Sequence, residues 1–288
     1  MLSISAKTKL LGILAHPIKH SISPQLHNTA LQKLGLDYVY LAFDVPEVDN
    51  KDAFIGLQKA GVHGLNISMP YKQIIIPYLN TITNRAKLSG SVNTVYIQDG
   101  KYCGDTTDGQ GFMQGLYDKG WHPQGKKMTI LGAGGAAFAI VVQALLDGVQ
   151  EVVLYQRQSH RYLQAQEKIE AIQGFLPGKV YLRSLADHAR LQKDINESYI
   201  LVNASSVGMG STMESSSLPK KNYLTSSLKV VDIIYHPVRT TLLKQAEKIG
   251  ADYMNGKRML LFQAAASFHI WTKQEMPIDI MKEILEIE

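Results

Sequence analysis

The chain has 288 residues, of which 45% are hydrophobic and 19% charged, and it carries a formal net charge of +5. This hydrophobic content supports one large or two modest folded domains and excludes a chain that is disordered throughout. The charge is mild and the basic residues are spread along the sequence, so we expect a surface that attracts small anionic ligands and does not bind nucleic acid.

Cysteine content and hydropathy exclude several further classes of protein. The single cysteine, Cys103, excludes an intrachain disulfide and a cage of several cysteines around a metal, and it is typical of the reducing cytoplasm. No apolar run approaches the ~20 residues needed to cross a bilayer. The short apolar stretch at residues 10–15 has no cleavage-like site after it, so we expect no signal peptide. We therefore expect a cytoplasmic protein that does not bind membranes; a monomer and a homodimer both remain open.

The first part of the chain alternates short apolar runs with helix-like segments. The expected strands are residues 10–14, 38–45 and 64–69, and the expected helices are residues 24–34 and 52–59. This alternation predicts an α/β layer with a mostly parallel sheet. A further helix is expected at residues 108–119, where Gly120 ends it.

A second α/β region begins near residue 126. Its expected strands and helices are strands 128–131, 151–155, 199–203, 229–234 and 251–254, helices 136–147 and 259–271, and a short helix from about residue 278. The serine-rich residues 211–217 are expected to form a surface loop. We predict two α/β lobes: a substrate-binding domain of residues 1–107, completed by C-terminal helices in residues 258–288, and a nucleotide-binding Rossmann domain of residues 108–257.

A glycine-rich turn joins the first strand of the second region to its helix. Gly132 permits a tight turn, Gly134 lets the backbone approach a pyrophosphate, and the small Ala137 permits close packing of helix and strand. The first N–H groups of the helix then face the phosphates. We predict a dinucleotide site, with an ordinary tight turn as the alternative. Its expected residues are Gly132, Ala133, Gly134, Gly135 and Ala136.

The end of the next strand bears on the choice of cofactor. A site that prefers NAD usually places an acidic side chain there to hold the ribose hydroxyls. The segment at residues 155–161 has no carboxylate, but Arg157 and Arg161 can form charge-assisted hydrogen bonds with a 2′-phosphate. We therefore expect NADP, with NAD as the alternative cofactor and with two solvated surface arginines as the alternative interpretation.

Seven separated segments carry the remaining motifs of the chain. They are Pro17-Ile18-x-His20-Ser21-x-Ser23-Pro24, Asn66-Ile67-Ser68-x-Pro70-x-Lys72, Val92-Asn93-Thr94, Thr107-Asp108-x-x-Gly111, Gly132-x-Gly134-Gly135-Ala136, Asp232-x-x-Tyr235-x-Pro237 and Gly256-x-x-Met259-Leu260-x-x-Gln263. In their order and spacing, from about residue 12 to residue 271, these segments resemble the shikimate dehydrogenase and quinate/shikimate dehydrogenase family. The resemblance implies an oxidoreductase that reversibly reduces 3-dehydroshikimate to shikimate with NADPH, in aromatic amino acid biosynthesis.

The resemblance also implies roles for individual residues. Lys72 matches the family's catalytic lysine and Asp108 its paired aspartate, and this agrees with the chemistry, because hydride removal from a carbinol requires a group that takes the hydroxyl proton. The implied substrate-binding residues are Ser21, Ser23, Ser68, Asn93, Tyr235 and Gln263. The further implied cofactor-binding residues are Gln156, Arg157, Arg161, Ser205, Ile233 and Gly256. Ser23 has a second interpretation as a helix N-cap, and Tyr235 as an aromatic side chain at the edge of the core.

The sequence departs from the family pattern at four positions. Ser68 and Ser205 stand where threonine is common, and Thr106 and Gln156 stand where asparagine is common. The segment at residues 68–73 is similar to the branch that also accepts quinate. A quinate/shikimate dehydrogenase that uses NAD is therefore the first alternative, and a non-catalytic regulator that senses NADP(H) and a metabolite is the second.

The histidines are too scattered along the sequence to predict a metal site. His16, His20, His27 and His63 are interpreted as structural or surface residues, and this type of hydride transfer requires no metal. We expect no metal ligands in this protein.

Overall fold

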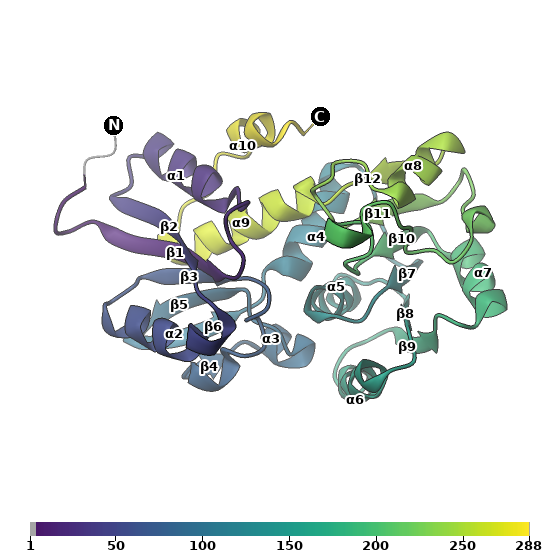
Figure 1. Ribbon diagram of the computed structural model, residues 1–288, viewed down its shortest axis with the longest axis horizontal. Coiled ribbons are helices and arrows are strands. Elements are labelled where there is room, and N and C mark those ends of the chain that lie inside the picture. Colours follow the sequence, from purple (N-terminus) through teal and green to yellow (C-terminus); the bar gives the residue numbers. More distant parts are fainter. Residues whose placement is uncertain (1–3, 288) are drawn as a thin grey trace. The chain divides into compact units, whose positions relative to one another are not determined.

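The computed structural model describes residues 4–287, and its internal contacts divide the chain into two units (Figure 1). The first unit consists of the chain up to Gly111 together with the chain from Leu261 onward, and the second is Phe112–Leu260. The sequence-based division was placed after residue 107 and after residue 257, a few residues from each of these boundaries. The outer ends of the predicted first domain, residues 1–3 and 288, lie outside the described residues.

The sheet of the first unit combines parallel and antiparallel strands. Its order is β2 (Tyr38–Asp44), β1 (Lys9–Ala15), β3 (Gly64–Ile67), β5 (Thr94–Gln98), β6 (Lys101–Asp105) and β4 (Thr81–Ile82). The β2–β1–β3 half is parallel, as the strand–helix alternation predicts, and β5 runs antiparallel to β3 and β6. Asp99 and Gly100 join β5 to β6 with positive φ angles of 50° and 73°, which is the turn that an Asp-Gly pair favours.

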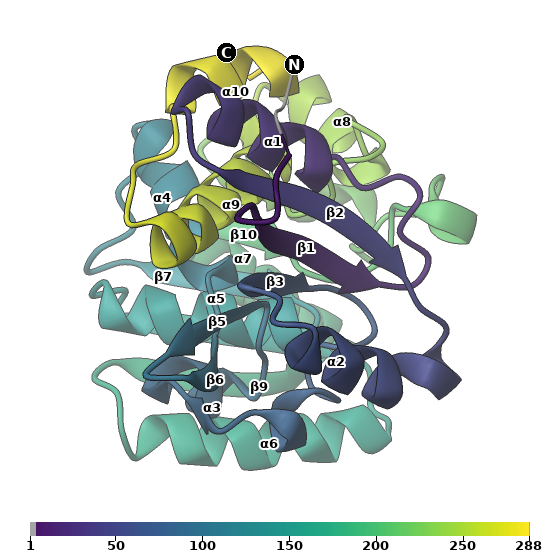
Figure 2. The same cartoon turned by 90° about the vertical axis from the view of Figure 1, so that its left-hand side faces the viewer.

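Helices cover both faces of this sheet, and the faces differ in chemistry. The helices of the first unit are α1 (Ser23–Lys33), α2 (Asn50–Lys59), α3 (Asn84–Ser89), α10 (Ile278–Leu285) and most of α9 (Lys257–Thr272), with short helices at Glu47–Asp49 and Ile76–Tyr78. Leu65, Ile67 and Val95 pack in an apolar core with residues of α2 and α3. Because side chains alternate along a strand, Asn66 and Thr94 point to the other face, where both contact Ser267 of α9. In Figure 2 the strands β2, β1, β3, β5 and β6 lie in sequence between these helices.

The second unit is a wholly parallel sheet. Its order is β12 (Tyr253–Met254), β11 (Lys229–Asp232), β10 (Ile200–Asn203), β7 (Lys127–Leu131), β8 (Glu151–Gln156) and β9 (Lys179–Ser184). Counted from β7 in chain order, this is the strand order of the doubly wound dinucleotide-binding fold. The chain reverses direction across the sheet between β7 and β10, so the loops that follow these two strands border the crevice in which such folds bind ligands.

The helices of the second unit lie on both sides of its sheet. They are α4 (Asp108–Asp118, from residue 112), α5 (Gly135–Leu146), α6 (His160–Gln173), α7 (His188–Glu197) and α8 (Thr241–Lys248), with short helices at Gly210–Thr212 and Lys221–Tyr223. Side-chain oxygens of Asp187 and Thr240 accept the first free N–H groups of α7 and α8 and so fix where these helices begin. Val153, Leu201 and Val230 share one core cluster with residues of α7 and α8, so these helices cover one face.

A buried ion cluster ties α7 to the sheet of the second unit. Asp194 has no exposed surface, and its carboxylate accepts hydrogen bonds from Lys127 Nζ at 2.7 Å and Tyr155 Oη at 2.6 Å. Arg183 and Arg190 approach the same carboxylate at 3.2 Å and 3.4 Å. The buried charge is therefore paired on several sides, which is the condition under which a buried carboxylate is tolerated.

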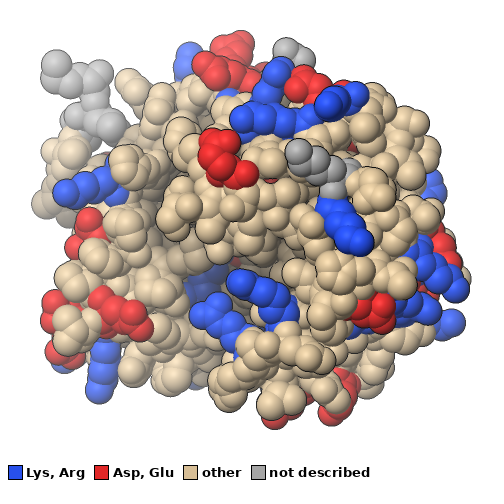
Figure 3. All heavy atoms as spheres, turned by 45° about the vertical axis from the view of Figure 1, so that its right-hand side comes forward, with Lys and Arg blue, Asp and Glu red and all other residues tan. Residues whose placement is uncertain are grey.

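Two observations concern the surface and the classes of ligand. Within residues 4–287, no helix is both long and apolar enough to span a membrane. On the face that Figure 3 shows, Lys and Arg side chains are interspersed with Asp and Glu side chains instead of forming one continuous basic surface.

Candidate active site

A lysine and an aspartate form an ion pair in the first unit. Lys72 lies in the turn that follows β3, and Asp108 is the first residue of α4. Lys72 Nζ lies 2.5 Å from Asp108 Oδ2, with 20% of the lysine side chain and 5% of the aspartate side chain exposed. The backbone N–H of Val92 donates to the Lys72 carbonyl at 2.8 Å and fixes the turn. The pair that the sequence predicted is thus assembled, and its ammonium keeps a small accessible surface.

Asn93 holds the other oxygen of this carboxylate. Asn93 Nδ2 donates to Asp108 Oδ1 at 2.9 Å and lies 3.2 Å from Gln263 Oε1 on α9. Asn93 Oδ1 accepts the backbone N–H of Thr107 at 2.7 Å, which sets the orientation of the amide. Both carboxylate oxygens of Asp108 therefore have a donor, and four of the predicted residues, Lys72, Asn93, Asp108 and Gln263, are in one connected group.

Behind this group lies a buried polar network that sequence reasoning missed. Asn66 Nδ2 donates to the Asn93 carbonyl and to Ser267 Oγ, both at 3.1 Å, and Asn66 Oδ1 accepts from Tyr40 Oη at 2.8 Å. Thr94 Oγ1 lies 2.7 Å from Ser267 Oγ. Two signals were present in the sequence: the alternation of strand residues, and the position of Ser267 four residues after Gln263, one helical turn along the same face.

Ser21 and Ser23 lie at the start of α1. Ser23 is its first residue, and the backbone N–H of Ser23 donates to Ser21 Oγ at 3.3 Å. Ile22 is the N-cap residue and α1 has no side-chain cap hydrogen bond, so neither serine acts as the cap that was the alternative interpretation. The two hydroxyls at the start of this 11-residue helix suit an anionic group such as a carboxylate. Ser68, just after β3, is partly buried, and its N–H donates to the Leu14 carbonyl.

The predicted glycine turn follows β7 in the second unit. Gly132 has φ +103°, and a Cβ there would lie 3.0 Å from the Ala204 carbonyl oxygen, so glycine is required both for the turn and for the approach of the loop after β10. Gly134 is the N-cap of α5, which has no side-chain cap hydrogen bond, and no atom lies within 4 Å of the position of its missing Cβ. Ala133, Gly135 and Ala136 complete the turn, and Ala137 is fully buried. Free N–H groups with open space before them fit a pyrophosphate.

The remaining cofactor-side residues lie at the carboxyl ends of neighbouring strands. Gln156 ends β8, and both Arg157 and Arg161 are exposed and have no ion pair within residues 4–287. Ser205 follows β10, and its hydroxyl donates to Asn203 Oδ1 at 2.7 Å. β8 and β10 are the two strands that flank β7, so Gln156 and Ser205 lie at the ends of the strands on either side of the one that leads into the glycine turn.

A buried aspartate holds the turn that carries Ile233 and Tyr235. Asp232 accepts hydrogen bonds from Thr240 Oγ1 at 2.7 Å, Asn203 Nδ2 at 3.1 Å and the Ile234 N–H at 3.1 Å. Burial raises the pKa of Asp232 to about 6, against the opposing effect of these donors. Tyr235 is 40% exposed and belongs to the second unit, with Ile233.

Gly256 lies beside the same turn. A Cβ at Gly256 would lie 2.0 Å from the Ile233 carbonyl oxygen, so no larger residue fits without movement of the backbone. The N–H of Gly256 donates to the Ile234 carbonyl at 3.0 Å. The two segments that the sequence assigned to the cofactor, after β11 and before α9, therefore contact each other directly.

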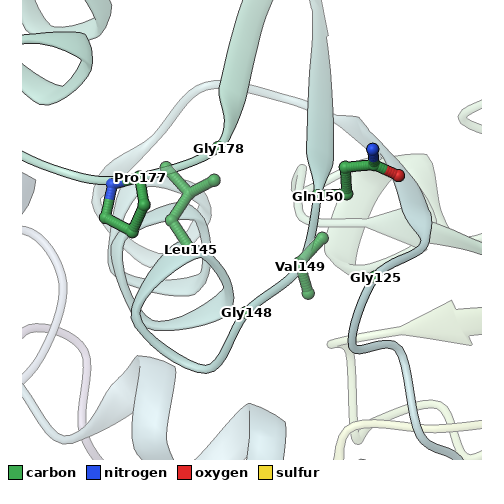
Figure 4. A pocket seen from close by; sticks show the side chains of 7 residues that line it. All are labelled: Gly125, Leu145, Gly148, Val149, Gln150, Pro177 and Gly178. Atoms are coloured by element: carbon green, nitrogen blue, oxygen red, sulfur yellow. The ribbon is translucent and has the colours of Figure 1, made fainter.

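A separate shallow hollow lies at the amino ends of the strands of this sheet (Figure 4). Gly148, Val149 and Gln150 precede β8, Pro177 and Gly178 precede β9, and Gly125 and Leu145 complete its lining. None of these residues has an ionisable side chain, and the hollow lies at the amino ends of the strands, whereas the glycine turn lies at their carboxyl ends. The hollow is therefore not the candidate site. Within the described residues, no group of three or more His, Cys, Asp and Glu side chains is placed to hold a metal ion.

The fold and the two sets of residues define a class of protein. A doubly wound parallel sheet with an open glycine turn is the arrangement that binds a dinucleotide, and a lysine–aspartate pair in the other α/β unit is chemically suited to proton transfer. These features together define a dehydrogenase that uses a pyridine nucleotide.

Comparison with known proteins gives the family. A profile of the shikimate dehydrogenase substrate binding domain matches residues 13–95, and one of the shikimate 5′-dehydrogenase C-terminal domain matches residues 256–286. A shikimate dehydrogenase (NADP+) of Listeria monocytogenes serotype 4b is 45% identical over 282 residues, which cover 98% of this chain and 97% of the relative. The chain belongs to the shikimate dehydrogenase family.

Two solved structures agree with this membership. A Listeria monocytogenes shikimate 5-dehydrogenase in complex with shikimate and NAD has a TM-score of 0.92 and 45% identity, with 98% of each chain covered. A shikimate dehydrogenase in complex with NADP+ has a TM-score of 0.86 and 35% identity, with 99% of this chain and 96% of that chain covered. The predicted fold class and family are confirmed.

Proposed function

We propose that this protein is an NADP-dependent shikimate dehydrogenase, which reversibly reduces 3-dehydroshikimate to shikimate. The observation that carries the proposal is the Lys72–Asp108 pair, at 2.5 Å and tied to Asn93 and Gln263, in a chain that matches shikimate dehydrogenases over nearly its whole length. A protein that only bound these ligands would have no chemical need for a proton-transfer pair.

The chemistry that these residues support is the movement of one proton. When shikimate is oxidised, the carbinol C–H bond breaks and its electron pair leaves with the hydrogen as hydride, while the O–H proton must go to a base. The bound nicotinamide supplies the hydride acceptor or donor. Lys72 Nζ is the group that takes the hydroxyl proton, and in reduction it returns a proton to the ketone oxygen. Asp108 lies within hydrogen-bonding distance of this nitrogen and orients it.

The remaining residues of the first unit support binding of a polyhydroxylated acid. Ser21 and Ser23, at the start of α1, are proposed to hold the carboxylate, and Ser68, Asn93 and Gln263 the ring hydroxyls. Uncharged donors and acceptors suit a polyol, because a site built to hydrogen-bond hydroxyls discriminates strongly against analogues that lack them. Tyr235 of the second unit is proposed as a further substrate contact.

The cofactor assignment rests on the second unit. The open space at Gly134 and the uncapped start of α5 fit a pyrophosphate, and the exposed Arg157 and Arg161 support a 2′-phosphate. Gln156, Ser205, Ile233 and Gly256 are proposed to contact the adenosine and nicotinamide portions. We further propose that the protein works in the cytoplasm, in accordance with its one cysteine, as a monomer or homodimer.

A kinetic grid of two acids and two cofactors tests the function. Formation of reduced nicotinamide is followed by absorbance with shikimate or quinate and with NADP+ or NAD+, and kcat/KM is compared. We expect the highest kcat/KM for shikimate with NADP+. A higher value for quinate or for NAD+ would favour the broader quinate/shikimate branch. Binding of shikimate and NADP+ without conversion at any pH would show a regulator instead.

A pair of lysine variants tests the proposed mechanism. Lys72→Ala is expected to abolish turnover while NADP+ binding, which depends on the second unit, is retained. Lys87→Ala is the matched control, because Lys87 is exposed on α3 of the same unit, and its kcat should equal that of the wild type. Comparable losses in both variants would contradict the role of Lys72.

A further inference from the structure

Tyr40 is a fully buried tyrosine in the centre of β2 that the proposed reaction does not use. Its ring stacks on His27 of α1, with ring centroids 4.3 Å apart and an interplanar angle of 8°, and Trp271 of α9 lies at a centroid distance of 6.1 Å. Asn28 holds the strand at this point through two hydrogen bonds to the backbone N–H and carbonyl of Tyr40, at 2.9 Å and 2.8 Å. The position and ring plane of Tyr40 are therefore determined on every side.

The hydroxyl of Tyr40 reaches the polar network behind the proposed site. It donates to Asn66 Oδ1 at 2.8 Å. Burial raises the pKa of Tyr40 well above that of a free tyrosine, so the hydroxyl keeps its hydrogen as a donor. Tyr40 thus anchors Asn66, whose amide in turn holds the Asn93 carbonyl.

This single hydrogen determines how the Asn66 amide is oriented. A tyrosine hydroxyl that donates to Asn66 must face its oxygen, so the NH2 group is turned toward the Asn93 carbonyl and Ser267 Oγ, each 3.1 Å away. Asn93 in turn donates to Asp108 Oδ1 at 2.9 Å, and Asp108 Oδ2 pairs with Lys72. Without the hydroxyl, the buried Asn66 Oδ1 loses its donor, and the amide is free to turn over or shift to find another.

We propose that Tyr40 is a positioning residue for this reaction: through Asn66 and Asn93 it sets the location of the Lys72–Asp108 pair. The inference rests on the proposed function, because it concerns the position of the proton-transfer group of that reaction. His27 acts indirectly, because its stacked ring holds the plane of Tyr40. A displacement of about 1 Å at the reacting group is enough to lower a rate by ~100-fold.

Removal of the hydroxyl alone tests the proposal. Tyr40→Phe keeps the ring and its packing, and we expect kcat for shikimate to fall by about 10- to 100-fold, while KM for NADP+ stays at the wild-type value. Tyr38→Phe is the matched control, because it removes a hydroxyl from the same strand whose partner is Lys9, outside the site, and it should leave kcat unchanged. A Tyr40→Phe enzyme with kcat within twofold of the wild type would overturn the proposal, even if its thermal stability were lower.

A double-variant cycle tests the route through Asn66. If Tyr40 acts through Asn66, adding Tyr40→Phe to the Asn66→Ala variant should lower kcat little further. If the two residues act independently, the fold-losses in kcat of the two single variants would multiply in the double variant. Multiplying effects would overturn the route.

His27→Ala and His27→Phe form a second pair of variants. The alanine variant should lose activity, and the phenylalanine variant, which keeps a stacking ring, should recover it. If the phenylalanine variant binds NADP+, and is therefore folded, but does not recover activity, the stacking role of His27 is wrong.

Failure of this inference is distinguishable from failure of the proposed function. The wild-type enzyme in the same assay reports the function, and a wild type that does not convert shikimate contradicts the function itself. The affinity for shikimate, measured by calorimetry on wild type and Tyr40→Phe, then still reports whether Tyr40 orders the polar residues around Asn93. Equal affinities in that case would overturn the inference as well.

Discussion

Replacing Lys72 by methionine should lower both activity and stability, for separate reasons. Methionine has similar length and no charge, so the variant loses the proton-transfer group, which contributes about 10²- to 10⁴-fold in rate. It also leaves the Asp108 carboxylate, 5% exposed, without its cation. Removing one partner of a fully buried ion pair costs about 3–5 kcal/mol. Since 20% of the Lys72 side chain is exposed, water screens part of this, and we expect a loss of roughly 2–3 kcal/mol.

A second substitution separates the two effects. Asp108→Asn removes the unpaired charge but keeps an oxygen that accepts from Asn93, so the double variant Lys72→Met/Asp108→Asn should regain much of the lost stability. Its kcat should stay as low as that of Lys72→Met, because no base has been restored. Thermal unfolding with NADP+ absent measures the first quantity, and steady-state turnover of shikimate measures the second.

The result that would refute this reasoning is specific. Lys87→Met, an exposed lysine of the same unit, serves as the control for loss of a charge and should match the wild type in both assays. If Lys72→Met is as stable as the wild type, or if Asp108→Asn destabilises it further, the pair is not a coupled buried charge. If Lys72→Met keeps more than a tenth of the wild-type kcat, Lys72 is not the proton-transfer group.

Four further outcomes are expected. Gly134→Ala should leave stability unchanged, because no atom lies within 4 Å of the new Cβ. Calorimetry should nevertheless show the affinity for NADP+ reduced by roughly tenfold or more, because that space is where a pyrophosphate must approach. Alanine at both Arg157 and Arg161 should raise KM for NADP+ by roughly 10- to 100-fold and leave KM for NAD+ unchanged. The reason is that charge-assisted hydrogen bonds to the 2′-phosphate are worth about 1.5–3 kcal/mol each. An equal rise of KM for both cofactors would contradict the 2′-phosphate role. Burial lowers the pKa of His27 from 6.5 to about 3, so between these values the unfolded chain binds a proton that the folded chain does not, and stability falls as pH falls. Urea unfolding should therefore show the wild type losing about 2 kcal/mol more than His27→Phe between roughly pH 7 and pH 5; parallel losses would be the contrary result. Asp194→Asn should lower the free energy of unfolding by about 3 kcal/mol, because it leaves the cations around this position with fewer partners. A change below about 0.5 kcal/mol, the level of an ordinary surface substitution, would show that the ion cluster does not contribute to stability.

Local patterns identified most of the elements that carry function. The apolar run before Gly132 and the helix after it could be recognised without tertiary information, because turn, strand and helix are set by neighbouring residues. The β5–β6 hairpin was missed, although Asp99-Gly100 is a strong turn signal. The helices α6, α7 and α8 were also missed, although Asp187 and Thr240 are N-cap residues of the kind that mark a helix start.

For the candidate site, the sequence predicted the residues that face the substrate and the cofactor. Lys72, Asn93, Asp108 and Gln263 were predicted from the resemblance of their motifs to the family, and the structure joins the four in one hydrogen-bonded group. The sequence also predicted a dinucleotide cofactor, because the glycine turn with its flanking strand and helix is a local pattern.

Only the tertiary structure decided what lies behind those residues. The contacts of Tyr40 with His27 and Asn66, and of Asn66 with Ser267, join segments of β2, α1, β3 and α9 that are up to 201 residues apart in the chain. A hydrogen bond or a stacked pair depends on distances of a few ångströms and on the direction of an amide, and no local pattern encodes these across such separations. The sequence therefore determined which groups this protein has available, and packing of the sheet against α1 and α9 decided which of them meet.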